Sequence, residues 1–198
     1  MKIFTVRHGR THWNVLGRMQ GQTDIPLDDV GIDQAQRLGL RLANEKVDIV
    51  YTSDLLRAAK TAEIINTHHN AEFVLTPALR EISFGIYEGS VYADVAEDLS
   101  YTNYDNLEHP VPGGESIYGY FDRIQAFIHD VVTAAKHQNI ILVGHYGTVR
   151  AAICYFLEVP PEDRHKFHID NTAIHCFQRD ADGKFKMILE NDSSHLDY

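Results

Sequence analysis

The sequence is poor in three features that would place it in a special class: cysteine, long apolar runs and basic charge. Only two of its 198 residues are cysteines. Both, Cys154 and Cys176, lie in apolar segments, so we expect buried thiols and neither a disulfide framework nor a cysteine-based metal site. No apolar run approaches the ~18 residues that a membrane span needs. Acidic residues outnumber lysine and arginine by 28 to 18, which argues against a nucleic acid as a partner.

The N-terminus also lacks the pattern of a secretory signal, because the stretch MKIFTVRHG becomes polar too early. We therefore expect a cytoplasmic protein that does not enter a membrane. With 44% hydrophobic and 23% charged residues, the composition is that of an ordinary globular chain. Histidine is plentiful, with 12 residues. The pairs His68–His69 and His165–His168 nevertheless lack clustered acids or cysteines at ligand spacing, and we expect no metal site.

Strand and helix signals alternate along the chain. Buried strands are predicted at residues 2–6, 47–51, 72–75 and 139–143. Helices are predicted at residues 29–44, 55–65, 117–132 and 148–157. The segment Thr52–Asp54 gives a cap signal for the second helix, and Ser116 is the expected cap of the third. An Asp-Gly turn between residues 173–178 and 185–189 predicts a final hairpin.

This order predicts an α/β fold with three α-β-α layers, a mostly parallel central sheet and an antiparallel C-terminal edge made by the hairpin. Residues 85–115 fit neither a strand nor a long helix, so we expect them to form a small cap insertion. We find no internal repeat and no low-complexity linker, and we expect residues 1–198 to form a single domain.

Polar side chains follow each predicted parallel strand. They are Arg7 and His8; Thr52, Ser53, Asp54 and Arg57; Arg80 and Glu81; His145 and Tyr146. Ligands of open parallel sheets bind beyond the carboxyl ends of the strands. These side chains are therefore expected to meet on one rim of the sheet, although they are far apart in sequence.

The chemistry of this rim fits phosphoryl transfer. Guanidinium groups bind phosphate oxygens bidentately, and two such clamps would hold a phosphate dianion without a metal. Positive surroundings favour a neutral imidazole at His8, which could act as a nucleophile if its other ring nitrogen met a fixed acceptor such as a backbone carbonyl. Glu81 would give a proton to the leaving oxygen and later activate water.

Each of these residues also has a structural interpretation. An RHG tripeptide occurs often by chance, and Arg57 could lie on a solvated helix face. Glu81 could be a surface carboxylate and His145 a histidine in a turn. Their joint occurrence, each just past a different predicted strand, is what favours a catalytic site.

Several motifs together resemble the histidine phosphatase superfamily, the phosphoglycerate-mutase-like enzymes. They are RHGRTHWN, RMQGQTDIPLDDVG, YTSDLLRAAKTAE, LREISFGIYEG, PGGES and VGHYGTVR. The resemblance implies that His8 is the phosphorylated nucleophile, that Arg7 and Arg57 clamp the phosphate, that Glu81 is the proton donor and acceptor, and that His145 is a second pocket histidine. It also implies that Asn14, Gln20 and Gly21 complete the phosphate and substrate pocket, and that no metal or organic cofactor is required.

Three positions depart from the usual family pattern. Arg10 replaces the Glu, Gln or Ser of RHGET-like motifs, Tyr146 stands where SHGG-like motifs have glycine, and Ile86–Tyr87 replaces an acid and a tryptophan. None of these changes removes a catalytic group. Arg10 and Tyr146 flank catalytic residues, so we expect them to affect the substrate preference. Tyr146 is also predicted to bind the substrate.

The superfamily contains both hydrolases and mutases. A mutase has to keep water away from its phosphorylated intermediate, and the mutases resembled here have longer chains with a different glutamate motif. The short chain and the PGGES motif favour a metal-independent phosphomonoester hydrolase similar to broad-specificity and α-ribazole phosphatases. A cofactor-dependent phosphoglycerate mutase and a non-catalytic phosphate-binding regulatory module remain as alternatives. The expected partner is a small phosphomonoester, and the protein could be a monomer or a homodimer.

Residues 81–122 contain no lysine or arginine. This stretch holds nine acids, namely Glu81, Glu88, Asp94, Glu97, Asp98, Asp105, Glu108, Glu115 and Asp122. It also holds six tyrosines, namely Tyr87, Tyr92, Tyr101, Tyr104, Tyr118 and Tyr120. If the cap faces the pocket, it would disfavour a second anionic group on the substrate and stack neutral or aromatic leaving groups on tyrosine. Alternatively, the acids form a solvated surface and the tyrosines a local core.

Overall fold

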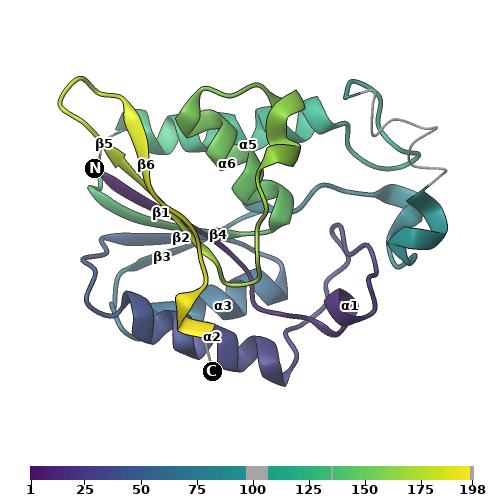
Figure 1. The fold of residues 1–198 in the computed structure, drawn as a ribbon, viewed down its shortest axis with the longest axis horizontal. Helices are drawn as coiled ribbons and strands as arrows, with labels where there is room; N and C mark the ends of the chain where they lie inside the picture. The colour runs from purple at the N-terminus through teal and green to yellow at the C-terminus, as the bar shows by residue number, and fades with distance from the viewer. Residues whose placement is uncertain (97–106, 135, 197–198) are drawn as a thin grey trace.

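The computed structural model describes residues 1–96, 107–134 and 136–196 and contains one six-stranded sheet (Figure 1). The strands are β1 Lys2–Arg7, β2 Ile49–Ser53, β3 Glu72–Thr76, β4 Asn139–Gly144, β5 Ile174–Arg179 and β6 Phe185–Asp192. Their order is β3-β2-β4-β1-β5-β6. The first four are parallel, whereas β5 is antiparallel to β1 and β6 to β5. The predicted parallel sheet with an antiparallel C-terminal edge is confirmed.

Helices cover both faces of this sheet (Figure 1). Helices α5 Ile117–Ala134 and α6 Tyr146–Leu157 lie on one face, and α2 Asp29–Leu42 and α3 Leu56–Asn66 lie on the other. Four-residue helix α1 His12–Val15 lies beyond the sheet. Four short 3-10 helices occur among the described residues: η1 Pro77–Leu79, η2 Gly85–Tyr87, η3 Pro161–Lys166 and, after the last strand, η4 Ser194–Leu196. The three-layer prediction is therefore confirmed, although the sequence pattern did not predict α1 or the 3-10 helices.

The two layers of helices bury two separate apolar clusters, one on each side of the sheet. On one side Ile3 of β1 and Leu142 of β4 pack with Ile124 and Ile128 of α5. On the other side the neighbouring strand residues Phe4 and Ile141 pack with residues of α2 and α3. Successive side chains of a strand point to opposite faces, so the central strands are apolar on both faces. This double burial holds the carboxyl ends of the strands in place.

The boundary between β2 and α3 differs from the predicted one. The strand extends to Ser53, two residues beyond the expected end, and the helix N-cap is Leu55, which provides no side-chain cap. The Leu56 amide instead donates to Asp24 Oδ1 at 2.7 Å. The predicted cap at Thr52–Asp54 was therefore wrong, because the carboxylate of Asp24, distant in sequence, accepts from the start of the helix. Ser53 is instead the last residue of β2. The Ser116 cap is confirmed, with Gly119 N donating to its Oγ at 3.0 Å.

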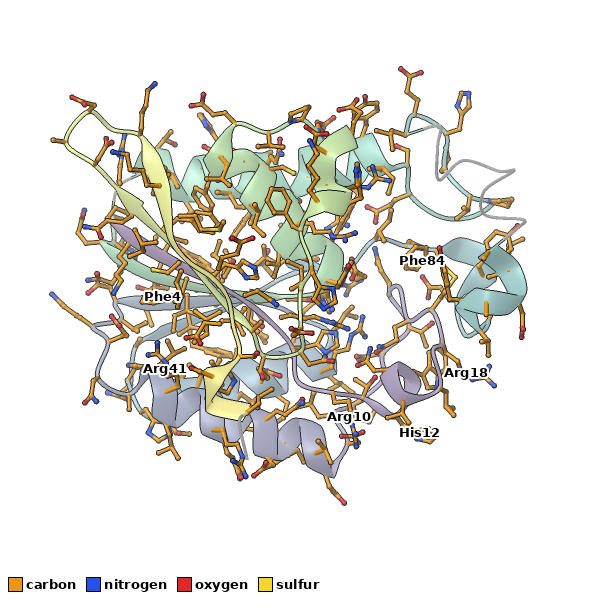
Figure 2. The ribbon with its side chains drawn as sticks, viewed as in Figure 1. Phe4, Arg10, His12, Arg18, Arg41 and Phe84 are labelled. Carbon is orange, nitrogen blue, oxygen red and sulfur yellow. The ribbon has the colours of Figure 1, made fainter. Side chains whose placement is uncertain are left out.

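The described part of the predicted cap lies against the segment that follows α1. Met19 N donates to Ser90 O at 2.9 Å and Gly89 N donates to Met19 O at 2.8 Å. Arg18 and Phe84 consequently lie at the same end of the molecule (Figure 2). The cap positions Glu97, Asp98, Tyr101, Tyr104 and Asp105 lie outside the described residues.

Both cysteines are buried and free, as expected. No helix in residues 1–96, 107–134 or 136–196 is long and apolar enough to cross a membrane.

Candidate active site

His8 follows the last residue of β1 and is 3% exposed. Its Nδ1 atom lies 2.7 Å from the carbonyl oxygen of Gly9. A carbonyl can only accept, so in the neutral ring the proton is on Nδ1 and the lone pair is on Nε2. Burial, with the positive charges of Arg57 and Arg7, holds the pKa of His8 well below its usual 6.5. The ring is therefore a neutral imidazole at physiological pH.

Two arginines lie near His8, and the first of them, Arg7, is partly buried. Arg57, in the first turn of α3, is fully buried and donates to Gly21 O at 2.7 Å and to Thr23 O at 2.9 Å. Arg7 donates to Ile169 O at 2.7 Å. Burial lowers the pKa of Arg57 to about 10 and also lowers the pKa of Arg7, while the charge of Glu81 opposes both shifts. Both guanidiniums remain charged, and the Nε atom of each is buried without a hydrogen-bond partner among the described residues.

His145, the N-cap of α6, is completely buried beside His8. The two ring centres are 5.2 Å apart. The Nε2 atom of His145 lies 2.9 Å from Ser53 Oγ, which also accepts from Leu55 N at 3.3 Å. Its Nδ1 atom is buried and has no partner among the described residues. Burial, followed by the charge of Arg57, holds the pKa of His145 well below its usual value.

Glu81 follows η1, at the carboxyl end of β3, and is 9% exposed. Its Oε1 atom accepts from Tyr120 Oη at 2.8 Å and from Ile82 N at 3.0 Å, whereas Oε2 accepts only the longer 3.2 Å bond from Gly147 N. Oε1 is therefore fixed by two donors and Oε2 is the less engaged oxygen. Glu81 does not lie on an open surface, so that structural interpretation does not hold.

Tyr120 of α5 connects Glu81 to a second hydroxyl. Its Oη lies 3.0 Å from Thr148 Oγ1, and Thr148 donates to Leu79 O at 3.2 Å. Burial and the neighbouring Glu81 raise the pKa of Tyr120 well above 10. Its proton is thus always available to the carboxylate.

Gly147 is required at its position because the backbone of α6 approaches Glu81 closely. A Cβ atom there would lie 2.6 Å from Glu81 Oε1 and 2.9 Å from Tyr120 Cε1. The helix starts at Tyr146, two residues earlier than predicted, which places the Gly147 amide among the unpaired donors of its first turn. This early start allows the helix to bind the carboxylate.

These groups surround a pocket of about 220 Å³. Its lining includes the predicted residues Arg7, His8, Asn14, Gln20, Gly21, Arg57, Glu81 and Tyr146. Asn14 Oδ1 is held by Thr11 N at 3.0 Å. Gln20 is buried, and its Oε1 has no partner within the described chain. His145 lies behind His8 and is absent from the lining. The convergence predicted from the strand ends is thus present in the structure.

Two arginines near the site in sequence have structural partners instead. Arg80 makes a bidentate pair with Asp54, at 2.7 and 2.6 Å, and does not line the pocket. Arg10 pairs with Asp28 at 2.9 Å. Arg80 therefore remains on the rim but does not enter the pocket, because its side chain pairs with Asp54, which directly follows β2.

The structure supports only one part of the cap hypothesis. Tyr92 lines the pocket, together with Phe84 and Tyr146. Among the described residues, Glu81 is the only acid in that lining. Glu88 turns inward to Gln22 N and Thr23 Oγ1, and Glu115 pairs with Arg123. The described cap therefore offers aromatic rings to a ligand, and the expectation that its acids repel anions is not supported there.

The family model described as "Histidine phosphatase superfamily (branch 1)" matches residues 3–192. The chain belongs to this superfamily. The resemblance inferred from the motifs is confirmed.

Curated relatives of this chain include a mutase-like protein and a phosphatase. Phosphoglycerate mutase-like protein 4 of Arabidopsis thaliana is 34% identical over 99% of this chain and 87% of its own length. Adenosylcobalamin/alpha-ribazole phosphatase of Escherichia coli (strain K12) is 30% identical over 86% of each chain. A crystal structure of a phosphoserine phosphatase variant from Entamoeba histolytica in complex with phosphoserine has a TM-score of 0.87, with 30% identity over 98% of each chain.

The sequence motifs do not assign roles to all residues of the site. The sequence pattern places Tyr120 and Thr148 in helices and Ser53 in a helix cap. Ser53 and Thr148 lie inside quoted motifs, but no role was expected for them, because they act through contacts with His145 and Glu81's partner Tyr120 that only the tertiary structure creates. Phe84, Tyr92 and Arg18 also line the pocket. Tyr92 is one of the tyrosines of the predicted cap, whereas Arg18 and Phe84 lie in quoted motifs without an expected role.

Proposed function

We propose that this histidine phosphatase is a metal-independent phosphomonoester hydrolase that works through a phosphohistidine at His8. One observation carries the proposal. His8 is a neutral imidazole whose Nδ1 is bound to Gly9 O at 2.7 Å, beside the buried Arg57 and the partly buried Arg7. This arrangement leaves Nε2 as a nucleophile that needs no proton removed.

The donors around His8 suit a phosphate dianion. The buried Nε atoms of Arg7 and Arg57 and the Nδ1 atom of His145 have no partners among the described residues. Ser53 can donate to His145 Nε2, which leaves Nδ1 of His145 as a donor. Charge-assisted bonds from such donors are the strong ones in phosphate recognition. Asn14, Gln20 and Gly21 would complete the phosphate site, and Tyr146 would lie beside the leaving group.

In the first step, His8 Nε2 forms a bond to phosphorus while the bond from phosphorus to the leaving oxygen breaks. Glu81 gives its proton to that oxygen. In the second step, Glu81 takes a proton from water, the water oxygen bonds to phosphorus, and the P–N bond breaks. The less engaged Oε2 atom is suited to carry this proton, since Tyr120 and Ile82 fix Oε1.

The protein itself supplies the positive charge in this scheme. Two guanidiniums near a transferred phosphoryl group offset its charge and keep it in line for attack. No metal ion or organic cofactor is needed for either step. A purely binding module would not require Glu81 to be held by three donors, which argues against the regulatory alternative.

Phosphorus NMR of a phosphate-ester panel in EDTA tests the proposal. The panel contains 3-phosphoglycerate with a trace of bisphosphoglycerate, sugar phosphates, nucleoside monophosphates and an aryl phosphate. We expect inorganic phosphate to accumulate in wild type and not in His8→Ala. Conversion to 2-phosphoglycerate without inorganic phosphate would make the protein a mutase. No reaction with any ester, or full turnover by His8→Ala, would overturn the proposal.

A further inference from the structure

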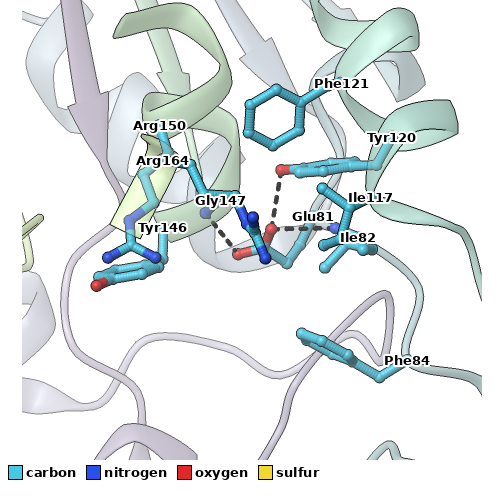
Figure 3. Close-up of a pocket in the computed structure, with 10 residues that line it drawn as sticks. All are labelled: Glu81, Ile82, Phe84, Ile117, Tyr120, Phe121, Tyr146, Gly147, Arg150 and Arg164. Atoms are coloured by element: carbon cyan, nitrogen blue, oxygen red, sulfur yellow. Dashed lines mark hydrogen bonds between the residues drawn. The ribbon is translucent and has the colours of Figure 1, made fainter. Parts of the chain in front are cut away.

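Tyr146 is the first residue of α6 and follows the buried His145. Its half-buried side chain lines both the active-site pocket and a smaller pocket that shares Glu81 and Phe84 with it (Figure 3). The family's SHGG-like motifs have glycine at this position, so this chain places a ring where those motifs place no side chain. A contact with the leaving group accounts for the exposed part of this ring, but not for the two arginines that lie against it.

Two guanidinium groups lie over the ring of Tyr146. The Cζ atom of Arg150 is 4.2 Å from the ring centre, and the Cζ atom of Arg7 is 5.2 Å from it. Both distances are within the ~6 Å over which the face of an aromatic ring attracts a cation. Tyr146 is therefore the shared aromatic partner of one arginine from the sheet and one from its own helix.

The helix itself places Arg150 over the ring. Residues four apart share one face of an α-helix, and their side chains lean toward its N-terminus. Arg150 accordingly extends back over Tyr146, and its Nε donates to Phe167 O at 2.8 Å. The ring of Tyr146 is thus packed against an anchored side chain from the next turn of α6.

Arg7 reaches the same ring from the end of β1. Its Nη1 donates to Ile169 O at 2.7 Å, whereas its Nε is buried without a partner among the described residues. A single hydrogen bond at one end leaves the plane of a guanidinium free to rotate, and a ring packed against the plane restricts that rotation. Burial lowers the pKa of Arg7, and the charge of Arg150 adds to this shift. The two cations are therefore close enough to repel each other, which the negative face of the ring offsets in part.

We propose that Tyr146 is a positioning residue for Arg7, and that its ring fixes the plane of the guanidinium so that Nε faces the phosphoryl group. Recognition of a phosphate by the planar fork of arginine depends on that orientation. The inference rests on the proposed function, since it assumes that a phosphoryl group is bound at His8. Because the ring acts through Arg7, its removal should weaken every ligand that carries a phosphoryl group, whatever the leaving group.

Inorganic phosphate separates this role from a contact with the leaving group, because it has no leaving group. Titration calorimetry of the whole chain with phosphate measures Kd without turnover. We expect Tyr146→Leu to raise this Kd about tenfold, a loss of about 1.4 kcal/mol. Tyr146→Phe keeps the ring and should stay within about twofold of wild type. An unchanged Kd in Tyr146→Leu, or an equal loss in Tyr146→Phe, would overturn the inference.

Steady-state kinetics with nitrophenyl phosphate distinguish positioning from a loss of folding. Tyr146→Leu should raise KM by about the same factor as the phosphate Kd and change kcat less than about threefold, because the clamp binds the dianion in the ground state and the transition state alike. A smaller folded fraction would instead lower kcat at constant KM, and that result would contradict the inference. Tyr155→Leu is the matched control, since it removes a tyrosine of α6 that lines neither pocket. We expect it to keep the wild-type KM and phosphate Kd.

A double-mutant cycle shows whether the ring acts through Arg7. Arg7→Lys keeps the charge as a point cation that has no plane to orient. In that background Tyr146→Leu should raise the phosphate Kd by less than about threefold, so the two changes should not be additive in free energy. A further tenfold loss would mean that the ring acts independently of Arg7, and the inference would be wrong. If wild type binds phosphate but hydrolyses no ester, the proposed function fails, whereas the calorimetric comparison still decides the role of Tyr146.

Discussion

The Nδ1 atom of His8 and the carbonyl oxygen of Gly9 are 2.7 Å apart. This contact between adjacent residues fixes the tautomer of the proposed nucleophile. It depends on close packing, because a Cβ atom at Gly9 would lie 2.4 Å from the carbonyl oxygen of Gly31 in α2. The glycine of the RHG motif therefore lets the chain pass against α2 while its carbonyl orients His8.

The low pKa of His8 should affect how kcat/KM depends on pH in mild acid. Burial and the two arginines hold that pKa well below 6.5, so the ring stays neutral as the pH falls through the usual histidine range. We expect kcat/KM for an aryl phosphate, corrected for the ionisation of the ester, to change little between about pH 7 and 6. An inflection near 6.5 in that corrected profile would show that His8 titrates normally.

Replacing Glu81 by glutamine should separate the two chemical steps. An aryl leaving group needs little protonation, so the first step should survive, whereas water activation should not. We expect Glu81→Gln to release about one equivalent of nitrophenol from nitrophenyl phosphate in a burst, followed by turnover about 10²–10⁴ times slower than wild type. Stopped-flow absorbance measures both phases. Glu63→Gln on the exposed part of α3 is the control, and unchanged steady-state turnover in Glu81→Gln would refute the role of Glu81.

A methyl group at Gly147 should displace Glu81. The added Cβ atom would lie 2.6 Å from Oε1, so the carboxylate has to move from its donors. A displacement of a catalytic group by about 1 Å can lower kcat by about 100-fold. Gly119→Ala, at an exposed position of α5 where Cβ would meet only Ser116 Oγ at 3.1 Å, should keep near-wild-type activity. Equal activity of the two variants in a steady-state assay would show that Glu81 tolerates the shift.

His175 makes the protein less stable in acid. It is completely buried on β5 opposite Thr5, and burial lowers its pKa to about 4. The folded state therefore binds this proton more weakly than the unfolded state, whose pKa is near 6.5. The contribution of neutral His175 is fully present above 6.5 and is lost as the pH falls toward 4.

The size of this effect can be measured with a variant that does not titrate. The difference between the two pKa values corresponds to an upper limit of roughly 3 kcal/mol. Between about pH 7 and 4, wild type should lose more free energy of unfolding than His175→Leu, by up to that amount. Urea denaturation at both pH values gives the comparison. Identical losses in the two proteins would mean that His175 is hydrated or partnered.

The sequence was sufficient to predict the layers of the fold and the residues at the strand ends. Parallel strands have to end at a common rim, so the polar residues that follow β1, β2, β3 and β4 can be grouped by their positions in the chain alone. His8, Arg57, Glu81 and His145 are predicted in this way, and their proximity is a consequence of topology.

The side-chain contacts that orient those residues could not be predicted from the sequence. Tyr120 lies on an apolar helix, where a buried tyrosine usually serves packing, and its bond to Glu81 depends on how α5 crosses the sheet. Arg80 adjoins Glu81 in sequence, yet its side chain pairs with Asp54. Such orientations depend on side-chain packing, which strand and helix periodicity does not encode.

Isolation of a phosphorylated protein would show whether His8 is the nucleophile. Wild type and Glu81→Gln would be mixed with an aryl phosphate in EDTA, quenched in base and mapped by mass spectrometry. We expect a phosphoryl group on the His8 peptide that is stable in base and lost in acid, more abundant in Glu81→Gln and absent in His8→Ala. Turnover in EDTA with no phosphoryl group on His8 in either protein, or with His8→Ala fully active, would contradict the phosphohistidine mechanism.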